Sequence, residues 1–350
     1  MVLSDSTGRR WAGAGWAQVF DDEGPLSTLV PMGPKTQADV GSVTKIVATT
    51  ASLAHLVDQG QLDLDSPCRR YLPKTAAFPV GYATVRDLLG HRAGLWEWWP
   101  LYLGATNAIQ ALENVARLPL RYPPNQARHY SDLGFQLLGS IIEAVVGRDL
   151  QASFRQLVAD PAGMAETNFA APGRGCEVAA SSRGDRIEME MLRSKKPYPV
   201  LGEAEDFPRW RRHVLVGEVN DGNAFHAYAG VAGHAGLFST AYDLVTFGEF
   251  WLRCLDGGAA VGAGTCRAFG RPGLDNHQAL GWRCGYSSFA DCSSPLLYHP
   301  GFPGVGLAIL AKHRATVVMV TNRLHVNSDP LPIEAMFLSS IQAAHEELHC

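Results

Sequence analysis

The chain has 350 residues, of which 46% are hydrophobic and 18% charged, and it carries a formal net charge of −4 at pH 7. A chain of this length and composition can bury a substantial core, so one elaborated domain or two subdomains are expected. It lacks the excess of positive charge that nucleic acid or an anionic membrane surface would attract. Neither is expected as a partner, and small-molecule chemistry is favoured.

The first 35 residues predict two strands joined by a turn at residues 5–8, followed by a loop. This region shows no basic stretch leading into an apolar run, and no window of about 18 apolar residues occurs anywhere in the chain. The sequence therefore predicts neither an export signal nor a membrane-spanning helix. A cytoplasmic location without a membrane partner is expected.

Residues 40–60 predict one buried helix, because apolar residues recur at three- and four-residue spacing and Gly60 supplies a stop. Ser42 and Lys45 would share a face of its first turn, so that hydroxyl and amine can touch. An amine whose pKa is lowered by partial burial and by the helix dipole could activate the serine as a nucleophile. By itself the spacing is also compatible with a helix-start serine and a solvated lysine.

A second helix is expected near residues 83–95, followed by a tryptophan-rich loop at 96–102. Trp96, Trp98 and Trp99 would suit an aromatic wall beside a cleft that binds a flat or apolar acyl group. Ordinary packing of the loop explains the same residues equally well.

A longer helix is expected over residues 133–147, where apolar residues recur at helical spacing and the final glycine is the stop. Residues 171–225 are irregular and mixed in charge, and a long excursion over the surface is expected there. Arg209, Arg211 and Arg212 follow acidic residues in this excursion, so a solvated surface is favoured over a site for an anionic substrate.

The last third of the chain turns to alternating apolar patterns that predict strands. Residues 296–310 and 316–322 are expected to form a hairpin, and residues 332–348 a closing helix. The cysteines are odd in number and lack C-x-x-C spacing, so reduced thiols without a catalytic role are expected. They are Cys68, Cys176, Cys254, Cys266, Cys284, Cys292 and Cys350.

Two further stretches add weight to the pair Ser42 and Lys45. Tyr130 shortly precedes the 133–147 helix, so its phenol can project from a loop beside a cleft. His299 lies on an expected strand, and Gly301 would let the backbone approach a ligand closely. The order Ser-x-x-Lys, Tyr-x-Asp, His-x-Gly resembles that of the penicillin-recognising serine enzymes, specifically the class C β-lactamase-like group that includes esterases and transacylases.

The resemblance extends to residues 87–95, 157–169 and 217–250. It implies one α+β catalytic domain over residues 1–350, with a mostly antiparallel sheet flanked by helices beside an all-helical subdomain and the site between them. The approximate parts are 1–70 with 214–350 for the α/β part and 71–213 for the helical part. The helix that usually precedes the first strand would be missing or replaced by the C-terminal helix.

The resemblance also implies roles for individual residues. Ser42 would attack an ester or amide carbonyl and become acylated, Lys45 would hold it and share its proton, and Tyr130 would shuttle a proton to the leaving group. Whether Lys45 or Tyr130 is the base in acylation stays open. The backbone N–H groups of Ser42 and Phe302 would hold the oxyanion, since Pro303 has no N–H to donate.

Two positions depart from the β-lactamase pattern. Asp132 stands where those enzymes usually have asparagine, and His299 where they have lysine, and both departures point toward esterase-like members. A carboxylate at Asp132 would favour the charged form of Lys45 and shift the role of base toward Tyr130. His299 would line the substrate site as a polar group that can titrate, next to Gly301. Without the resemblance, a lone histidine on a strand favours a structural role instead.

An acyl-serine hydrolase of small-molecule esters or amides is therefore expected, or a transacylase that passes the acyl group to an amine or alcohol acceptor. The alternative is a non-catalytic ligand-binding or sensing module, which predicts loss of Ser42, Lys45 or Tyr130, and all three are present. A true β-lactamase is disfavoured because no export signal is visible. No cofactor or metal is expected, since residues 62–65 lack the glycine and distal glutamate of a calcium loop. The acyl group, the leaving group and the oligomeric state stay open.

Overall fold

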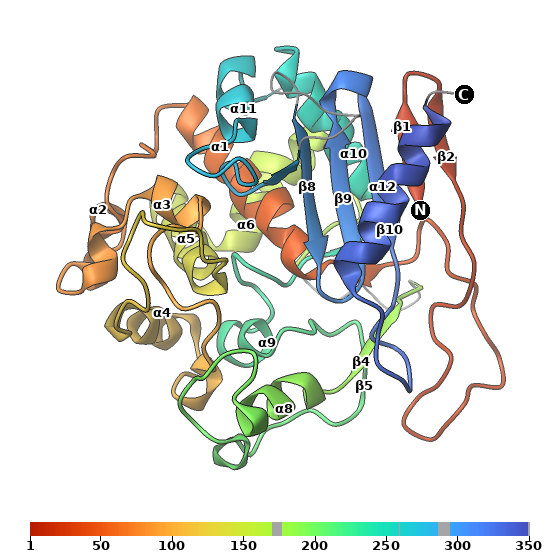
Figure 1. Ribbon diagram of the computed structural model, residues 1–350, viewed down its shortest axis with the longest axis horizontal. Coiled ribbons are helices and arrows are strands. Elements are labelled where there is room, and N and C mark those ends of the chain that lie inside the picture. The colour runs from red at the N-terminus through yellow and green to blue at the C-terminus, as the bar shows by residue number, and fades with distance from the viewer. Residues whose placement is uncertain (170–176, 259, 286–294, 349–350) are drawn as a thin grey trace.

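The computed structural model describes residues 1–169, 177–258, 260–285 and 295–348. A six-stranded sheet runs through it in the order β2, β1, β10, β9, β8, β7, and every pair of neighbouring strands is antiparallel (Figure 1). The strands are β1 Val2–Asp5, β2 Gly8–Trp11, β7 Arg283–Gly285, β8 Leu296–Gly301, β9 Val305–Leu310 and β10 Ala315–Val320.

The expected hairpin in the last third is a three-stranded meander. Residues 296–310 do not form one strand, because the chain reverses at residues 302–304 between β8 and β9. Gly304 permits this turn with a φ of 134°, and its N–H donates to the carbonyl of Gly301. The turn places Phe302 at the end of β8, where its backbone faces the residues around Ser42.

Helices cover both faces of the sheet. On one face α10 (Ala241–Leu255) packs on β1, β9 and β10, and on the other α12 (Ile333–Glu347) packs on β8, β9 and β10 (Figure 1). Phe337, Ile341 and Ala344 of α12 are buried against the sheet residues Leu3 and Val317. The α+β class and the class C β-lactamase-like architecture are confirmed, and the closing helix covers a face as expected.

Most other helices lie beside the sheet (Figure 1). They are α2 Cys68–Tyr71, α3 Val85–Leu89, α4 Ala108–Arg117, α5 Asp132–Val146, α6 Leu150–Phe154, α7 Asp160–Ala162, α8 Arg186–Ser194, α9 Gly222–Tyr228 and α11 Ala263–Gly270. The segment 71–213 also contributes β4 (Ala180–Arg183), which pairs with β5 (Val214–Val216). The division into subdomains at these boundaries stays a prediction.

The helix expected over residues 40–60 is a composite. It begins as a 3-10 turn at Gly41–Val43, continues as a π-helical segment at Lys45–Thr50 and ends as α1, Ala51–Asp58. Gly60 has a φ of 67°, in agreement with its expected role as the stop. All six residues of the π-helical segment are buried, so Lys45 projects into the interior rather than into solvent.

The excursion contains an interior that its sequence does not suggest. Arg209 and Arg212 are exposed as expected, but Arg211 is only 6% exposed. Its guanidinium donates two hydrogen bonds to the carboxylate of Asp185, at 2.9 and 2.6 Å. The expectation of a solvated surface is therefore wrong for Arg211, because its partner is a buried carboxylate and not the acidic residues that precede it.

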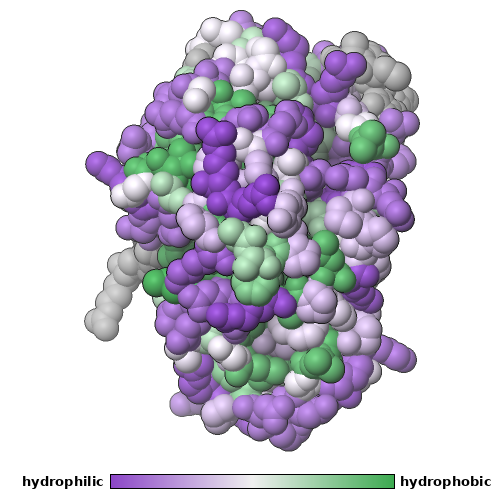
Figure 2. All heavy atoms as spheres, turned by 90° about the vertical axis from the view of Figure 1, so that its left-hand side faces the viewer, coloured by the Kyte–Doolittle hydropathy of each residue, from purple (hydrophilic) through white to green (hydrophobic). Residues whose placement is uncertain are grey.

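The outer surface of the helical part is mainly hydrophilic, and its apolar residues form separate small groups (Figure 2). Among the helices of the described ranges, none has the length and apolar character needed to cross a bilayer. Four of the seven cysteines, Cys68, Cys254, Cys266 and Cys284, are buried free thiols. The other three, Cys176, Cys292 and Cys350, lie outside the described residues.

Candidate active site

The side chains of Ser42 and Lys45 touch, as their spacing suggests. Lys45 Nζ lies 2.9 Å from Ser42 Oγ, and it also donates a hydrogen bond to the carbonyl oxygen of His234 at 3.1 Å. A third oxygen, Oδ1 of Asp132, lies 2.7 Å away. The lysine side chain is completely buried, so these three oxygens replace the water that an ammonium would otherwise bind.

Lys45 is a charged ammonium at neutral pH. Burial alone would lower its pKa, but the carboxylate of Asp132 and the phenol of Tyr130 outweigh burial and raise that pKa above its ordinary value. The lowered amine pKa considered for an isolated serine–lysine pair is therefore wrong here. The expectation that Asp132 favours the charged lysine agrees with this environment.

Tyr130 lies at the junction of several groups. Its ring centroid is 5.0 Å from Lys45 Nζ and 5.6 Å from the guanidinium carbon of Arg283. The imidazole rings of His91 and His299 lie 4.6 and 5.9 Å from it, centroid to centroid. Tyr130 is partly exposed, so its ring adjoins both the buried lysine and solvent.

The backbone next to Tyr130 is held in place by the tryptophan loop. Ser131 caps the N-terminus of α5, and its Oγ donates a hydrogen bond to the carbonyl of Trp96 at 2.6 Å. The N–H of Asp132 donates to the carbonyl of Glu97. Two consecutive residues are thus fixed immediately after the tyrosine, which limits where its phenol can point.

The two imidazoles beside Tyr130 are neutral. His299 is buried on β8, and burial, together with the charges of Arg283 and Lys45, holds its pKa well below the ordinary value. Burial and the same two cations act in the same direction on the pKa of His91. The expectation that His299 titrates is therefore wrong, because its site excludes water and is already positively charged.

Each histidine has one anchored ring nitrogen. Nδ1 of His299 lies 2.8 Å from the carbonyl of Pro300, and Nδ1 of His91 accepts a hydrogen bond from the N–H of Ser131 at 3.0 Å. Neither Nε2 atom has a hydrogen-bond partner within the described residues. Sequence reasoning did not assign His91 to the site, although its stretch carried part of the resemblance.

The turn that holds Ser42 is in close contact with the end of β8. Gly41 has a φ of 50°, and a Cβ at this position would lie 2.4 Å from Cδ of Pro303 and 3.3 Å from the backbone nitrogen of Phe302. A Cβ on Gly301 would lie 2.1 Å from the carbonyl oxygen of Val40. The sequence suggested that Gly301 lets the backbone approach a ligand. In the structure, the group that Gly301 allows to approach is instead the backbone of Val40, just before Ser42.

The contact brings the two expected oxyanion donors into adjoining backbone segments. The N–H groups of Ser42 and Phe302 make no hydrogen bond inside the part of the chain that the structure describes. Both are therefore available to a ligand oxygen.

A buried carboxylate, Asp39, fixes the backbone on the N-terminal side of Ser42. Asp39 ends β3 (Ala38–Asp39), where its Oδ1 accepts the N–H of Gly41 at 2.8 Å and its Oδ2 accepts the N–H of Asn220 at 2.6 Å. Burial raises its pKa to about 6, and the two backbone donors limit the rise. No pattern in the sequence pointed to this residue, because its second partner lies 181 residues away.

A second carboxylate, that of Asp221, contacts the residue whose carbonyl binds Lys45. Asp221 caps α9 through the N–H of Ala224, and its Oδ1 also lies 3.0 Å from Nε2 of His234, whose carbonyl accepts from Lys45. Burial would raise the pKa of Asp221, but His234, Ala224 and Lys45 hold it at about 2. Residues 220 and 221 therefore support both members of the pair.

The tryptophan loop is only partly available to a substrate. Trp98 is 5% exposed and packs with Tyr102, Leu192 and Phe207. It therefore does not belong to the open aromatic wall that the sequence suggested. Trp96 and Trp99 are partly exposed and meet edge to face, with ring centroids 4.9 Å apart. The difference arises because the excursion supplies a second apolar cluster that takes up Trp98.

A family model described as Beta-lactamase matches residues 1–337. The chain belongs to the Beta-lactamase family. As a member of that family it is assigned to the acyl-serine hydrolases, and the resemblance inferred from the three motifs is confirmed.

Proteins similar to this chain include an Escherichia coli (strain K12) protein named "Putative D-alanyl-D-alanine carboxypeptidase". It is 29% identical, with 93% of this chain and 78% of the relative covered. An N-acetylmuramyl-L-alanine amidase of Bacillus subtilis (strain 168) is 28% identical, with 93% and 76% covered.

Solved structures of other proteins share the fold. A class C beta lactamase from Rhodobacter sphaeroides has a TM-score of 0.71 at 18% identity, over 100% of this chain and 94% of that one. EstCE1, described as a hydrolase with promiscuous acyltransferase activity, has a TM-score of 0.71 at 19% identity, over 98% of this chain and 92% of that one.

No group of histidine, cysteine and acidic residues in the described ranges is arranged to hold a metal ion.

Proposed function

We propose that this chain is an acyl-serine hydrolase that cleaves an ester or amide bond of a small molecule, with Ser42 as the nucleophile. The observation that carries the proposal is the 2.9 Å contact between Ser42 Oγ and a buried ammonium, Lys45, which Asp132 neutralises. Burying a charged lysine costs free energy even when a carboxylate pairs with it, and apolar residues at the same positions would avoid that cost. The presence of this lysine on a serine hydroxyl therefore favours a functional role for the pair.

The charge of Lys45 assigns the proton transfers. An ammonium cannot accept the proton of Ser42, but it can donate a hydrogen bond to Oγ and stabilise negative charge on the nearby phenol of Tyr130. Tyr130, as its phenolate, is therefore the base in acylation: it takes the proton of Ser42 as Oγ attacks the carbonyl and becomes a neutral phenol. It then gives that proton to the departing alcohol or amine, as the bond between the carbonyl carbon and the leaving group breaks.

The developing oxyanion would be held by the N–H groups of Ser42 and Phe302, which adjoin each other across the contact at Gly41. Deacylation repeats the sequence in reverse. Tyr130 takes a proton from water, hydroxide adds to the acyl carbon, and the proton returns to Ser42 Oγ as the acid leaves. Burial and the nearby cations hold the pKa of His91 and of His299 well below the ordinary value, which favours neutral rings that line the site without adding to its positive charge.

Transfer of the acyl group to an amine or alcohol is the second candidate function. It is favoured by the partly exposed rings of Trp96 and Trp99, which offer an apolar surface for an acceptor close to the anchored Ser131. The acyltransferase activity in the description of EstCE1 suits acyl transfer. The amidase and carboxypeptidase names of the relatives suit hydrolysis.

Turnover of activated esters tests the proposal. Hydrolysis of p-nitrophenyl acetate is measured for the wild type, for Ser42→Ala and for Ser339→Ala, which makes the same change at an exposed serine on α12. The proposal requires loss of turnover in the first variant and wild-type turnover in the second. Equal turnover in all three proteins would contradict it.

Added amine or alcohol separates the two candidates. For a transacylase, the ratio of transfer product to acid saturates as acceptor concentration rises, because the acceptor occupies a site before it reacts. For a plain hydrolase the ratio rises linearly, with water prevailing at accessible concentrations.

A further inference from the structure

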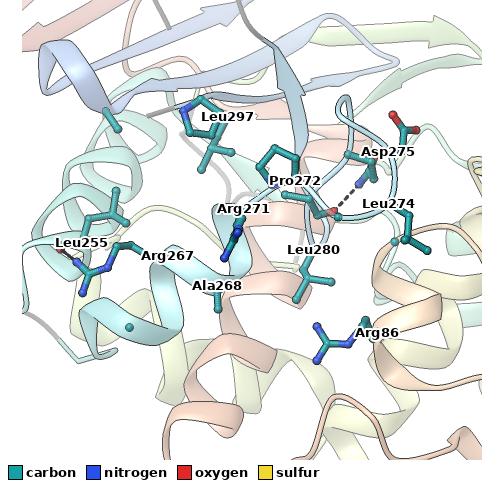
Figure 3. A pocket seen from close by; sticks show the side chains of 18 of the residues that line it. Arg86, Leu255, Arg267, Ala268, Arg271, Pro272, Leu274, Asp275, Leu280 and Leu297 are labelled. Atoms are coloured by element: carbon teal, nitrogen blue, oxygen red, sulfur yellow. Dashed lines mark hydrogen bonds between the residues drawn. The ribbon is translucent and has the colours of Figure 1, made fainter. Parts of the chain in front are cut away.

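A cavity of about 970 Å³ lies away from the pair Ser42 and Lys45, between α3, the C-terminal part of α10, α11 and the turn that joins β9 to β10 (Figure 3). Part of its wall is apolar. Leu252, Leu280 and Leu297 line it, and all three are buried. A fourth leucine, Leu274, lines it with 79% of its surface exposed. The volume is within the range of about 300–1,000 Å³ that is common for small-molecule sites.

Five arginines line the same cavity, and two of them are neutralised. Arg86 donates two hydrogen bonds to the carboxylate of Asp65, and Arg314 pairs with Asp256 at 2.6 Å. These two guanidiniums belong to ordinary surface ion pairs and need no further partner.

The other three arginines, Arg92, Arg267 and Arg271, have no carboxylate partner within the described residues. Arg92 donates to the carbonyl of Asn125, and Arg267 to the carbonyl of Leu255. Figure 3 shows Arg267 and Arg271 around the same cavity as Leu280, Leu297 and Pro272. Three arginines without a carboxylate partner thus line a space whose wall is in part apolar.

The acidic residues of the lining offset these charges only in part. Asp256 is paired with Arg314 and Asp275 with Arg128, whereas Asp87 accepts the N–H of Thr84 in the capping box of α3 and forms no ion pair within the described residues. Three arginines without a carboxylate partner therefore outnumber one carboxylate without a cationic partner. A partly apolar cavity with this excess of guanidiniums is complementary to a molecule that has an apolar body and an anionic head.

We propose that this cavity binds a small amphipathic anion, with a hydrocarbon part against the leucines and a carboxylate, sulfate or phosphate group at Arg267 and Arg271. The site is separate from the acylation centre. Gly90 and Arg92 line the cavity, while His91 between them packs its ring on Tyr130. The backbone of residues 90–92 therefore forms a wall between the two sites.

Calorimetric titration with three probes of equal chain length tests the proposal: octanoate, octan-1-ol and octylamine. Octanoate should bind at one site, more tightly than octan-1-ol by about fivefold or more, and octylamine more weakly than either. The octanoate affinity should fall with added salt, since screening weakens exposed charge interactions. Equal binding of octanoate and octan-1-ol would overturn the proposal.

Variants locate the site. Arg267→Gln combined with Arg271→Gln should weaken octanoate binding about fivefold or more and leave octan-1-ol unchanged. Both arginines are exposed, so folding should be unaffected. Arg148→Gln, at an exposed arginine outside the cavity, should bind octanoate as the wild type does.

Ser42→Ala separates this site from the proposed catalytic function. The variant should bind octanoate with wild-type affinity, whether or not Ser42 proves to be the nucleophile. Loss of octanoate binding in Ser42→Ala, or wild-type binding in the double arginine variant, would place the ligand elsewhere and overturn the proposal.

Discussion

Oδ1 of Asp132 lies 2.7 Å from Nζ of Lys45, and this ion pair sets the charge of the lysine that holds Ser42. The carboxylate comes from the first turn of α5 and the ammonium from the π-helical segment, so two elements about 90 residues apart meet at one charge pair. Because the ammonium stays protonated, the proposed mechanism passes its protons through Tyr130, whose ring centroid lies 5.0 Å from Lys45 Nζ.

Tyr130→Phe should lower turnover by about 100-fold or more with little change in substrate binding, because the ring is kept and only the proton carrier is removed. Steady-state kinetics on an activated ester checks this. Tyr82→Phe, at an exposed tyrosine of the helical part, should keep wild-type turnover. Near-full activity of Tyr130→Phe would leave Lys45 as the sole proton carrier.

Asp132→Asn should lower turnover less than Tyr130→Phe does, within about tenfold, because the amide oxygen can still accept a hydrogen bond from Lys45. The loss of the carboxylate should lower the pKa of Lys45, since burial is then less opposed. The alkaline limb of the pH profile of kcat/KM should therefore begin at a lower pH in the variant than in the wild type. An unchanged profile would show that Asp132 does not control the lysine.

Asp39→Asn should reveal the linkage of a buried carboxylate to stability. The folded-state pKa of Asp39 is raised from its ordinary value of about 4 to about 6, so the native state holds its proton more tightly than the unfolded chain. Its contribution to the free energy of unfolding is therefore largest below about pH 4. That contribution should decline as pH rises to about 6, by on the order of 3 kcal/mol.

Urea unfolding of the wild type and of Asp39→Asn at pH 4, 5, 6 and 7 measures this linkage. The stability of the wild type relative to the variant should fall over this range and then level off. A relative stability that rises with pH would mean that the N–H groups of Gly41 and Asn220 outweigh burial and lower the pKa of Asp39 instead.

Arg211→Gln should destabilise the protein by about 3–5 kcal/mol, because it leaves the buried carboxylate of Asp185 without its guanidinium partner. Arg212→Gln makes the same change at the next, exposed residue and should alter stability by no more than about 0.5 kcal/mol. Chemical denaturation compares the two. Equal changes in stability for the two variants would contradict a buried ion pair between Arg211 and Asp185 and would support the solvated position expected from the sequence.

Local patterns predicted much of the fold. Hydrophobic periodicity and a terminal glycine located α5 and the helix after Ser42, and both stops, Gly147 and Gly60, have the left-handed φ that the prediction requires. The contact between Ser42 and Lys45 also followed from spacing alone, since it lies within one turn of one segment.

Residues whose partners are distant in sequence could not be assigned in this way. The roles of Asp39 and Asp221 depend on hydrogen bonds to residues 220 and 234, and the burial of Arg211 depends on Asp185. Trp98 was misassigned for the same reason, because the cluster that buries it is built from the excursion. Charge and composition around each residue give no sign of such partners.

The identity of the acylated residue tests the central claim most directly. The wild-type protein is exposed to a panel of activated esters and to a β-lactam, and intact mass spectrometry with peptide mapping locates any adduct. The account predicts one acyl group on Ser42, absent from Ser42→Ala and present in Ser339→Ala, with an adduct mass that identifies the acyl class. An adduct of unchanged yield on the Ser42→Ala protein would contradict the assignment of Ser42 as the nucleophile.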